Sequence, residues 1–229
     1  MKAVILAGGA GTRLRPITET IPKPMAPING RPFLYYQLSD LRASGIKEIV
    51  LCIGYLGDQI KKYFGDGKKM ELKIRYSAEE AFLGTAGALK NAQKLIRDDF
   101  LLLFGDTYLP INHHQLIAYF QHHRPKHMAT MVVYDNQKPL TPANVALDKE
   151  NFITHYFKDG GLAHLTHLDA GVYVYKKEVL DFIPDPKRVK SQLEYTLFPT
   201  LIENRLMTGF LTNQRFYDIG TPERLTIFS

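Results

Sequence analysis

Short runs of aliphatic residues alternate, in the first half of the chain, with longer segments in which apolar residues recur every three or four positions. The short runs are typical of buried strands; they are Val4–Ala7, Glu48–Ile53, Phe100–Phe104 and Met128–Tyr134. The longer segments are typical of helices; they are Phe33–Ser44, Gly57–Phe64, Ala86–Ile96 and His113–His123. Strands that are apolar on both faces and separated by helices predict an α/β fold, with a mostly parallel sheet covered on both sides.

The second half of the chain is less regular from about Asn144 onward. Two further strands are predicted at residues 151–154 and Gly171–Tyr175, followed by a helix at Leu193–Glu203. Thr221-Pro222-Glu223 has the sequence of a helix start, with threonine as the N-cap and proline at the first helical position. No repeat, low-complexity tract or linker interrupts the chain, so we expect one domain over residues 1–229.

Composition narrows the function classes. The chain has 29 Lys and Arg against 23 Asp and Glu, a net charge of +6, and no basic run, so we expect a small polyanionic ligand and no nucleic-acid partner. The single cysteine, Cys52, excludes a disulfide framework and a cysteine-rich zinc site. No apolar stretch reaches the length of a signal peptide or a membrane span, so we expect a cytoplasmic protein without a membrane partner.

A glycine-rich turn, Gly8-Gly9-Ala10-Gly11-Thr12-Arg13-Leu14, directly follows the first predicted strand. Glycines let backbone N–H groups approach an anion closely at the carboxyl edge of such a sheet. The dinucleotide fingerprint is excluded because Leu14 stands where its third glycine belongs, and the Gly-Lys-Ser/Thr of a Walker A loop is absent. The turn therefore predicts an anion site of another type.

Two cations follow in this region. Arg13 can grip phosphate oxygens in a bidentate way, and Lys23, between Pro22 and Pro24, can add a point charge. Together with the glycines they favour triphosphate binding. The alternative is a tight turn carrying two solvated cations.

The stretch from Leu6 to Pro16, with Pro22-Lys23-Pro24-Met25, resembles the signature of the sugar-1-phosphate nucleotidyltransferases, and the resemblance continues to Asp218-Ile219-Gly220-Thr221-Pro222-Glu223. It implies a Rossmann-like, mostly parallel mixed sheet with helices on both faces, of the nucleotide-diphospho-sugar transferase type. It also implies a nucleotide-binding part at about residues 1–110 and a sugar-binding part at about 111–229. Residues 24–34 are most similar to the heptose-1-phosphate guanylyltransferase branch.

Asp106 and Asp218 each follow a short apolar run, where an aspartate alone is most often a cap or turn residue. Mg²⁺ is commonly held by one or two carboxylates together with substrate phosphates and waters. In the family that the chain resembles, the two corresponding aspartates hold the catalytic magnesium. The resemblance therefore implies Mg²⁺ as cofactor and Asp106 and Asp218 as its ligands.

The same resemblance implies the nucleotide site. Its residues would be Leu6, Ala7, Gly8, Gly9, Gly11, Thr12, Arg13, Glu79, Gly84 and Thr85. Residues 77–89 resemble the base-binding segment, in which proline usually stands at the position of Phe82, and we expect the helix opening at Gly84 to present free N–H groups. Two carboxylate oxygens of Glu79 could accept from guanine N1–H and N2–H₂, whereas uracil or thymine offers only N3–H, which favours guanine. Glu79 and Glu80 could equally form a solvated turn.

For the sugar phosphate, the resemblance implies Lys158, Asp169, Gly171 and Glu194. Asp169-Ala170-Gly171-Val172-Tyr173 is similar to the family's Asn-Ala-Gly-Ile-Tyr strand. An ionised aspartate can only accept hydrogen bonds, so Asp169 suits a sugar face rich in hydroxyls. Lys158 stands at the family's phosphate-binding lysine, without its usual Glu and Pro neighbours, and Glu194 at a glutamate that contacts sugar hydroxyls.

The eight histidines contain no His-x-x-x-His or His-Glu-x-x-His pair, so we expect surface histidines and no zinc site. The chain ends eleven residues after Asp218, so we expect no C-terminal β-helix module of the kind found in many family members.

The function that the resemblance implies is the conversion of a nucleoside triphosphate and a sugar 1-phosphate to a nucleotide sugar and pyrophosphate. GTP with heptose or mannose 1-phosphate is favoured. Arg13, Lys23, Asp106 and Asp218 would be the catalytic residues. The alternatives are uridylyl or thymidylyl transfer to a hexose or amino-sugar 1-phosphate, a non-catalytic nucleotide-sugar-binding protein, and a polyol-phosphate cytidylyltransferase. Association into a homo-oligomer is left open.

Overall fold

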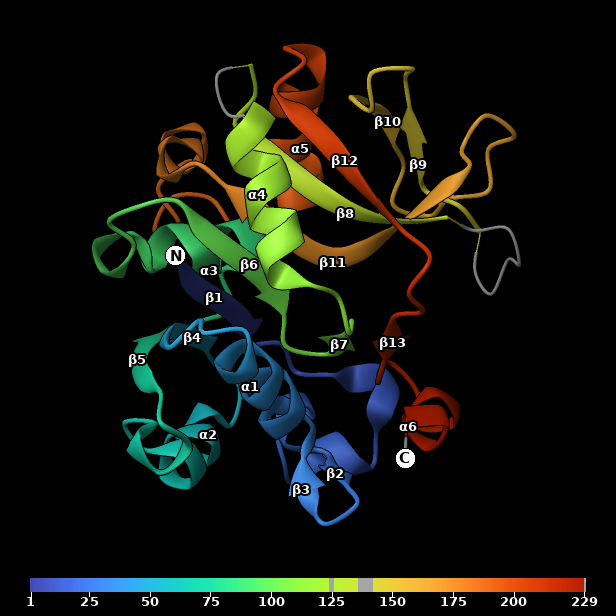
Figure 1. Ribbon diagram of the computed structural model, residues 1–229. Helices are drawn as coiled ribbons and strands as arrows, with labels where there is room; N and C mark the ends of the chain where they lie inside the picture. Colours follow the sequence, from blue (N-terminus) through green and yellow to red (C-terminus); the bar gives the residue numbers. More distant parts are fainter. Residues whose placement is uncertain (124–125, 136–141, 229) are drawn as a thin grey trace.

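A nine-stranded sheet lies at the centre of the computed structural model, which describes residues 1–123, 126–135 and 142–228 (Figure 1). Seven strands follow one another across it in the order β10-β9-β11-β6-β1-β4-β5, and β8 pairs with β11 and with β12. Their bounds are β1 Lys2–Ala7, β4 Glu48–Ile53, β5 Lys73–Ala78, β6 Phe100–Phe104, β8 Ala129–Asp135, β9 Val145–Leu147, β10 Ile153–Tyr156, β11 His167–Tyr175 and β12 Met207–Thr212.

The sheet is mostly parallel in the half that contains the glycine-rich turn. β1 runs parallel to β4 and β6, and β4 runs parallel to β5, whereas β11 is antiparallel to β6 and β8. Leu6 of β1 lies opposite Phe104 of β6. Because neighbouring parallel strands end at the same edge, the glycine-rich turn after β1 and the loop containing Asp106 after β6 lie side by side.

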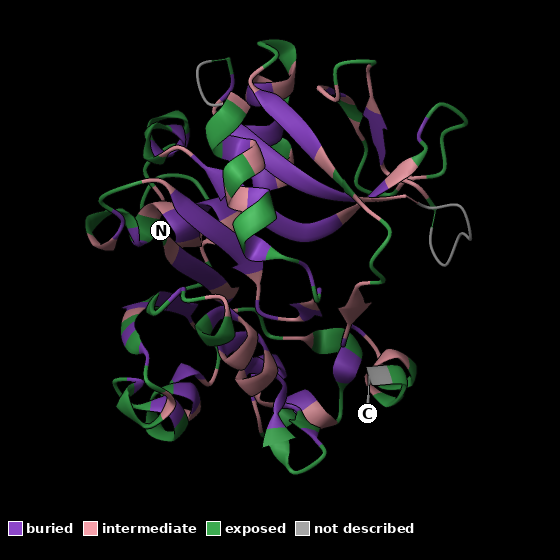
Figure 2. Ribbon diagram, viewed as in Figure 1, coloured by how far each residue is buried: buried purple, intermediate pink, exposed green. Residues whose placement is uncertain are grey.

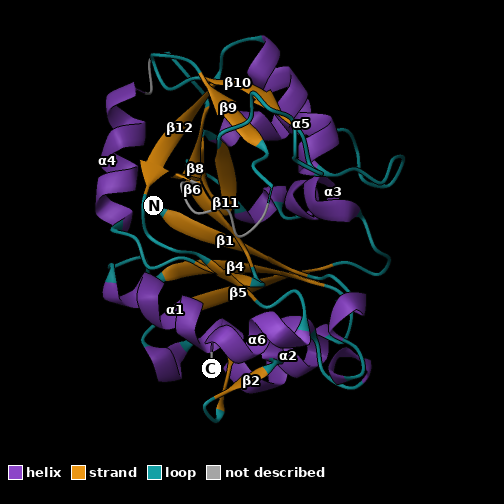
Figure 3. Cartoon of the chain, turned by 90° about the vertical axis from the view of Figure 1, so that its right-hand side faces the viewer, coloured by secondary structure: helices purple, strands orange, loops and turns teal. Residues whose placement is uncertain are grey.

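Helices cover both faces of the sheet, as predicted (Figure 3). One face packs against α1 (Phe33–Ala43), α2 (Gly57–Phe64) and α4 (His113–His123). The other packs against α3 (Gly84–Asn91) and α5 (Leu193–Glu203). The central strands β1, β4, β6 and β11 are mostly buried, and exposed residues gather on the outer helices and loops (Figure 2). Among the described residues, no helix combines the length and the apolar character needed to cross a membrane.

A smaller cluster lies beside the sheet and packs Leu14, Ala26, Ile28, Phe33 and Ile219 together. It contains segments far apart in the sequence, because Leu14 follows the glycine-rich turn and Ile219 follows Asp218. Two short antiparallel strand pairs adjoin this cluster. One joins β2 (Pro27–Ile28) to β3 (Arg31–Pro32), and the other joins β7 (Thr107–Tyr108) to the distant β13 (Tyr217–Asp218), which α6 (Pro222–Phe228) follows. The small cluster thus anchors two parts of the predicted site.

Several predicted elements differ from the structure. β5 and β12 were absent from the prediction, because exposed Lys73 and Arg75 interrupt the apolar pattern of the edge strand β5, and Thr208 and Gly209 interrupt that of β12. The helix expected at Ala86–Ile96 ends at Asn91 and is followed by a separate 3₁₀ turn.

The expectation that the histidines lie on the surface is wrong for His113 and His127, each of which exposes 1% of its surface. The ring of His113 is 3.1 Å from the hydroxyl of Ser44, and that of His127 is 3.2 Å from the hydroxyl of Thr130. Burial disfavours the charged imidazolium and lowers the pKa of each to about 4. Both side chains therefore pack as neutral polar residues at neutral pH.

Candidate functional site

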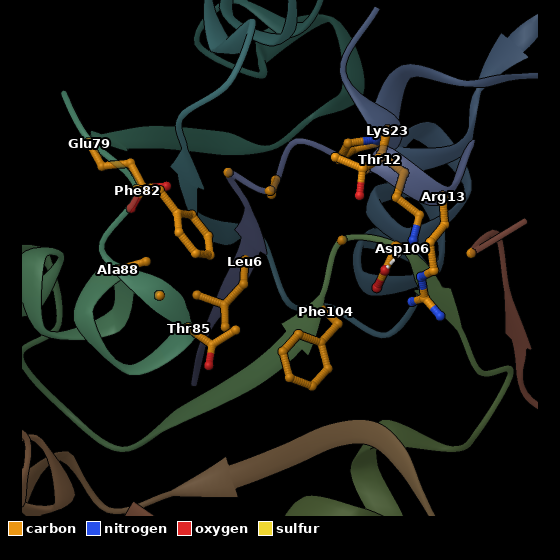
Figure 4. Close-up of a pocket in the computed structure, with 18 residues that line it drawn as sticks. Leu6, Thr12, Arg13, Lys23, Glu79, Phe82, Thr85, Ala88, Phe104 and Asp106 are labelled. Atoms are coloured by element: carbon orange, nitrogen blue, oxygen red, sulfur yellow. Dashed lines mark hydrogen bonds and ion pairs between the residues drawn. The ribbon is translucent and has the colours of Figure 1, made fainter. Parts of the chain in front are cut away.

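A cavity of about 300 Å³ opens where β1 and β6 end, and Figure 4 shows the side chains that surround it. Every residue predicted for the nucleotide lines it, together with Lys23 and Asp106. The other lining residues are Pro24, Phe82, Ala88, Phe104, Gly105 and Gly220. The cavity has two different ends, because Glu79, Phe82 and Thr85 lie on one side and Arg13, Lys23 and Asp106 on the other (Figure 4).

The glycine-rich turn needs glycine at Gly11. Its φ of +60° is in the left-handed region, and a Cβ there would lie 3.0 Å from side-chain carbons of Lys23 and Thr18. The hydroxyl of Thr18 also donates to the carbonyl oxygen of Gly11, at 2.8 Å. These contacts hold the turn tightly against the segment that contains Lys23.

Lys23 is buried, with 8% of its surface exposed, so the alternative of two solvated cations is wrong for Lys23, whereas Arg13 is exposed. Its Nζ lies 2.6 Å from Oδ2 of Asp106 across the cavity floor (Figure 4). The lysine begins a 3₁₀ turn, Lys23–Met25, and Pro22 before it and Pro24 after it restrict the backbone. The pair therefore places a cation and a carboxylate in direct contact at the edge of the sheet.

Gln37 holds the loop that carries Asp106, and the sequence analysis missed it. From α1 its side-chain amide donates to the carbonyl oxygens of Phe104, at 2.8 Å, and Thr107, at 2.6 Å. These two residues flank Gly105 and Asp106, so one buried side chain fixes both ends of the turn. The one signal for Gln37 in the sequence was a polar residue on the apolar face of a predicted helix. In the structure, only 2% of its surface is exposed.

Asp218 comes close to Asp106 through backbone pairing. Asp218 in β13 lies opposite Thr107 in β7, and the N–H of Ile219 donates to the carbonyl oxygen of Asp106 at 3.0 Å. The Asp218 carboxylate accepts from the N–H of Gly220, at 2.9 Å, and from Nη1 of Arg224, at 2.6 Å. Arg224 is a second residue that the sequence analysis missed.

The two aspartates offer the oxygen donors that a hard divalent cation such as Mg²⁺ prefers. Within the described residues, no three His, Cys, Asp or Glu side chains are grouped as a metal site. Mg²⁺ needs no such cage, because it takes one or two carboxylates and completes its shell with phosphates and water. Asp106 and Asp218, beside a cavity with cations for phosphates, fit that requirement.

Glu79 turns inward at the opposite end of the cavity, while Glu80 is exposed. Its Oε2 accepts from the N–H of Leu83 at 3.1 Å, and burial raises the pKa of its carboxyl, an effect that Lys190 opposes. A Cβ on Gly8 would lie 2.6 Å from Oε1, so glycine there makes room for the carboxylate. In the described part of the chain, no backbone N–H donates to Oε1, the other oxygen of this carboxylate.

The expectation of free N–H groups at the start of α3 is wrong for Ala86 and Gly87. The N–H groups of Ala86 and Gly87 donate to the carbonyl oxygen of Ser191, at 3.1 and 3.2 Å. Gly84, with a φ of +79°, allows this approach, because a Cβ there would lie 2.2 Å from the same oxygen. The segment that precedes α5 therefore caps α3 and occupies donors that we expected to face a ligand.

A second cavity, of about 240 Å³, adjoins the first and shares Phe104 with it. All of the residues predicted for the sugar phosphate line it, namely Lys158, Asp169, Gly171 and Glu194. Its further lining residues are Thr107, Asn144, Tyr156, Ala170, Tyr173, Phe198 and Phe216. The structure thus brings the predicted nucleotide and sugar-phosphate residues together in two neighbouring cavities, whereas Asp218 lines neither of them.

Asp169 lies where β11 bends. Its Oδ1 accepts from the N–H of Gly171 at 2.9 Å, and its Oδ2 accepts from the hydroxyl of Tyr173 at 2.6 Å. Gly171 has a φ of +70°, and the pairing of β11 with β8 shifts between Asp169 and Tyr173. Burial raises the pKa of Asp169 to about 6, although both hydrogen bonds favour the ionised form.

Glu194 connects the two cavities. It forms an ion pair with Lys158, whose Nζ also donates to Oε1 of Gln192 at 3.1 Å. Its other oxygen lies 3.5 Å from the hydroxyl of Thr85, which lines the first cavity. Lys158 and Glu194 therefore lie together between a cavity with cations for a triphosphate and one with acceptors for hydroxyl groups.

Comparisons with known proteins agree with this arrangement. The chain matches the family described as Nucleotidyl transferase over residues 2–228. It is 46% identical over 228 residues to the D-glycero-alpha-D-manno-heptose 1-phosphate guanylyltransferase of Campylobacter jejuni, a match that covers 97% of this chain and 96% of that protein. It is 33% identical to the mannose-1-phosphate guanylyltransferase of Mycobacterium tuberculosis; that match covers 96% of this chain, but only 61% of the longer relative. The solved structure of HddC from Yersinia pseudotuberculosis complexed with GMP-PN is 28% identical and superposes with a TM-score of 0.84, covering 99% of this chain and 96% of that one.

Proposed function

The chain belongs to the nucleotidyl transferase family, and on that premise we propose that it is an enzyme that joins a nucleoside triphosphate to a sugar 1-phosphate and releases pyrophosphate. The observation that carries the proposal is the meeting of two cavities at Phe104. The first presents Arg13 and Lys23 beside a glycine turn, and the second presents Lys158 beside two carboxylates. A two-substrate transfer between anions needs such a pair of adjoining sites.

In the proposed reaction, an oxygen of the sugar phosphate attacks the α-phosphorus in line, and the bond from that phosphorus to the β-phosphate oxygen breaks. Pyrophosphate leaves with that electron pair, so no protein nucleophile is needed. Both reactants are anions, and catalysis consists of positioning them and neutralising their charge. Arg13 would hold the leaving phosphates, Lys23 the α-phosphate, and Lys158 the phosphate of the sugar.

Asp106 and Asp218 would hold Mg²⁺, which supplies further neutralisation of phosphate charge when it is bound. The inward carboxylate of Glu79 supports a base that offers two adjacent N–H donors, which is guanine among the common bases. The activities for which the Campylobacter and Mycobacterium relatives are named support GTP with a heptose or mannose 1-phosphate. Since nucleoside triphosphates are its substrates, we place the enzyme in the cytoplasm.

We assign the nucleotide to the part at about residues 1–110 and the sugar phosphate to about 111–229. Three contributions cross that division, because Gly220 lines the nucleotide cavity, Thr107 lines the sugar-phosphate cavity and Phe104 lines both cavities. The division is therefore one of predominant contacts, and the C-terminal segment serves both substrates.

The test is a matrix of pyrophosphate-release assays with Mg²⁺. GTP, UTP, dTTP, ATP and CTP would each be combined with the 1-phosphates of mannose, glucose, an N-acetylhexosamine and a heptose. We expect the fastest release from GTP with the heptose or mannose compound, and no release from any pair would refute the proposal. Arg13→Ala and Asp218→Asn should each lose most of the turnover. Arg15→Ala is the matched control, because Arg15 is exposed and lies outside both cavities.

A further inference from the structure

Both carboxylates that would hold the metal already carry a cation of the chain. Asp106 Oδ2 lies 2.6 Å from Lys23 Nζ, and Asp218 Oδ2 lies 2.6 Å from Arg224 Nη1. The other oxygen of Asp218 accepts from the N–H of Gly220 at 2.9 Å. The charges of these two carboxylates and two cations therefore cancel at this edge of the sheet, and little net negative charge is left to attract a divalent ion.

The two cations differ in what else they can do. Lys23 lines the nucleotide cavity, so the proposed phosphates account for its position. Arg224 lines neither the nucleotide cavity nor the sugar cavity, and its partner in the described structure is Asp218. Its side chain is 40% exposed, so the guanidinium can leave the carboxylate and reach solvent. The proposed reaction gives this ion pair no part.

We propose that Arg224 is an internal counter-ion that competes with the divalent cation for Asp218, so that the nucleotide-free protein binds the metal weakly. This inference rests on the proposed function, which makes Asp218 a metal ligand. In the nucleotide-bound enzyme the triphosphate supplies the negative charge that the free site lacks, and the metal then displaces Arg224. If Arg224 instead oriented Asp218 toward the metal, replacing Arg224 would weaken Mn²⁺ binding in the experiment below.

The experiment measures Mn²⁺ binding to the full-length, nucleotide-free protein, from the loss of the electron paramagnetic resonance signal of free Mn²⁺. Arg224→Gln should bind Mn²⁺ at least about tenfold more tightly than the wild type, which corresponds to about 1.4 kcal/mol. Arg224→Lys, which keeps the positive charge, should stay close to the wild-type affinity. Equal or weaker binding by Arg224→Gln would overturn the inference.

Two further variants test whether the effect belongs to this site. Arg215→Gln is the matched control: it removes one positive charge nearby, from a side chain that lies 5.2 Å from the ring of Tyr217. Its Mn²⁺ affinity should change less than twofold, and a tenfold gain there would show that net charge alone is responsible. Adding Asp218→Asn to Arg224→Gln should abolish the gained affinity, and a gain that survives would contradict the competition.

The thermal unfolding midpoint of each variant shows whether it is folded. The outcome is separable from the proposed function, because no nucleotide or turnover enters the Mn²⁺ measurement. If the substrate matrix yields pyrophosphate and Arg224→Gln binds Mn²⁺ no more tightly than the wild type, only this inference fails. If no pair of substrates in those assays releases pyrophosphate, the proposed function itself is refuted.

Discussion

Replacing Gln37 by leucine tests how the loop that carries Asp106 is held. The substitution removes two short hydrogen bonds, to the carbonyl oxygens of Phe104 and Thr107, at 2.8 and 2.6 Å. Each carbonyl left buried without a donor costs about 1–3 kcal/mol. Leucine also removes Oε1 of Gln37, a buried atom without a partner in the described residues, which returns a cost of similar size.

We therefore expect a net loss of about 2 kcal/mol, or a fall of about 4–8 °C in the thermal unfolding midpoint for a domain of this size. We expect turnover to be affected more strongly than stability. A displacement of about 1 Å in a group that positions the reactants can lower the rate by ~100-fold. Because Asp106 would no longer be held in place, kcat should fall by about that factor, while KM for the nucleotide changes far less.

Circular dichroism and pyrophosphate release at saturating substrates measure the two effects. Gln115→Leu on α4 is the control, because its side chain is exposed, and it should leave both quantities unchanged. An unfolding midpoint and kcat equal to those of the wild type would show that the sheet alone holds the loop. A lower midpoint with unchanged kcat would show that Gln37 stabilises the fold without positioning Asp106.

Four titratable groups give further predictions. The pKa of Asp169 is about 6, so KM for the sugar 1-phosphate should rise as the pH falls from 7 to 5. The rise should be steeper in the wild type than in Asp169→Asn, and pyrophosphate release at saturating nucleotide measures it. His113 and His127 have folded pKa values of about 4, below the usual 6.5. The unfolded chain therefore binds more protons, and the free energy of unfolding should fall between pH 6.5 and pH 4, by ~3 kcal/mol for each histidine. Urea titrations check this, and a flat profile would contradict the burial argument. Burial raises the pKa of Cys52 to about 12, so iodoacetamide at pH 8 should leave the folded protein unmodified and alkylate it only in guanidinium chloride; rapid alkylation of the folded protein would be inconsistent with that environment.

The elements that the sequence predicted best are those with a strong local pattern. The apolar runs that became β1, β4 and β6 are buried on both faces, so every residue contributes to the signal. The edge strand β5 alternates exposed and buried residues and carries Lys73 and Arg75, and the prediction missed it. The pattern of a strand thus depends on its place in the sheet, which the local sequence does not contain.

The chemistry of the site followed from residues close together in the chain. Glycines that leave room for an anion, Arg13 beside them, and Lys23 held between two prolines are local features, because backbone conformation and side-chain charge act over a few residues. The burial of Lys23, its contact with Asp106 and the opposite position of Thr107 and Asp218 depend on strands that meet only in the folded chain.

The sequence by itself determined the layered α/β architecture and the residue types gathered around each cavity, because periodicity and short motifs record both. Only the tertiary structure decided that Gln37 holds the Asp106 loop, that Ser191 caps α3 and that Arg224 pairs with Asp218. The first two contacts end on backbone groups, which every residue shares, and the third joins charged types common on any surface. Such contacts leave no periodic or compositional trace, so they become visible only when distant segments are placed side by side.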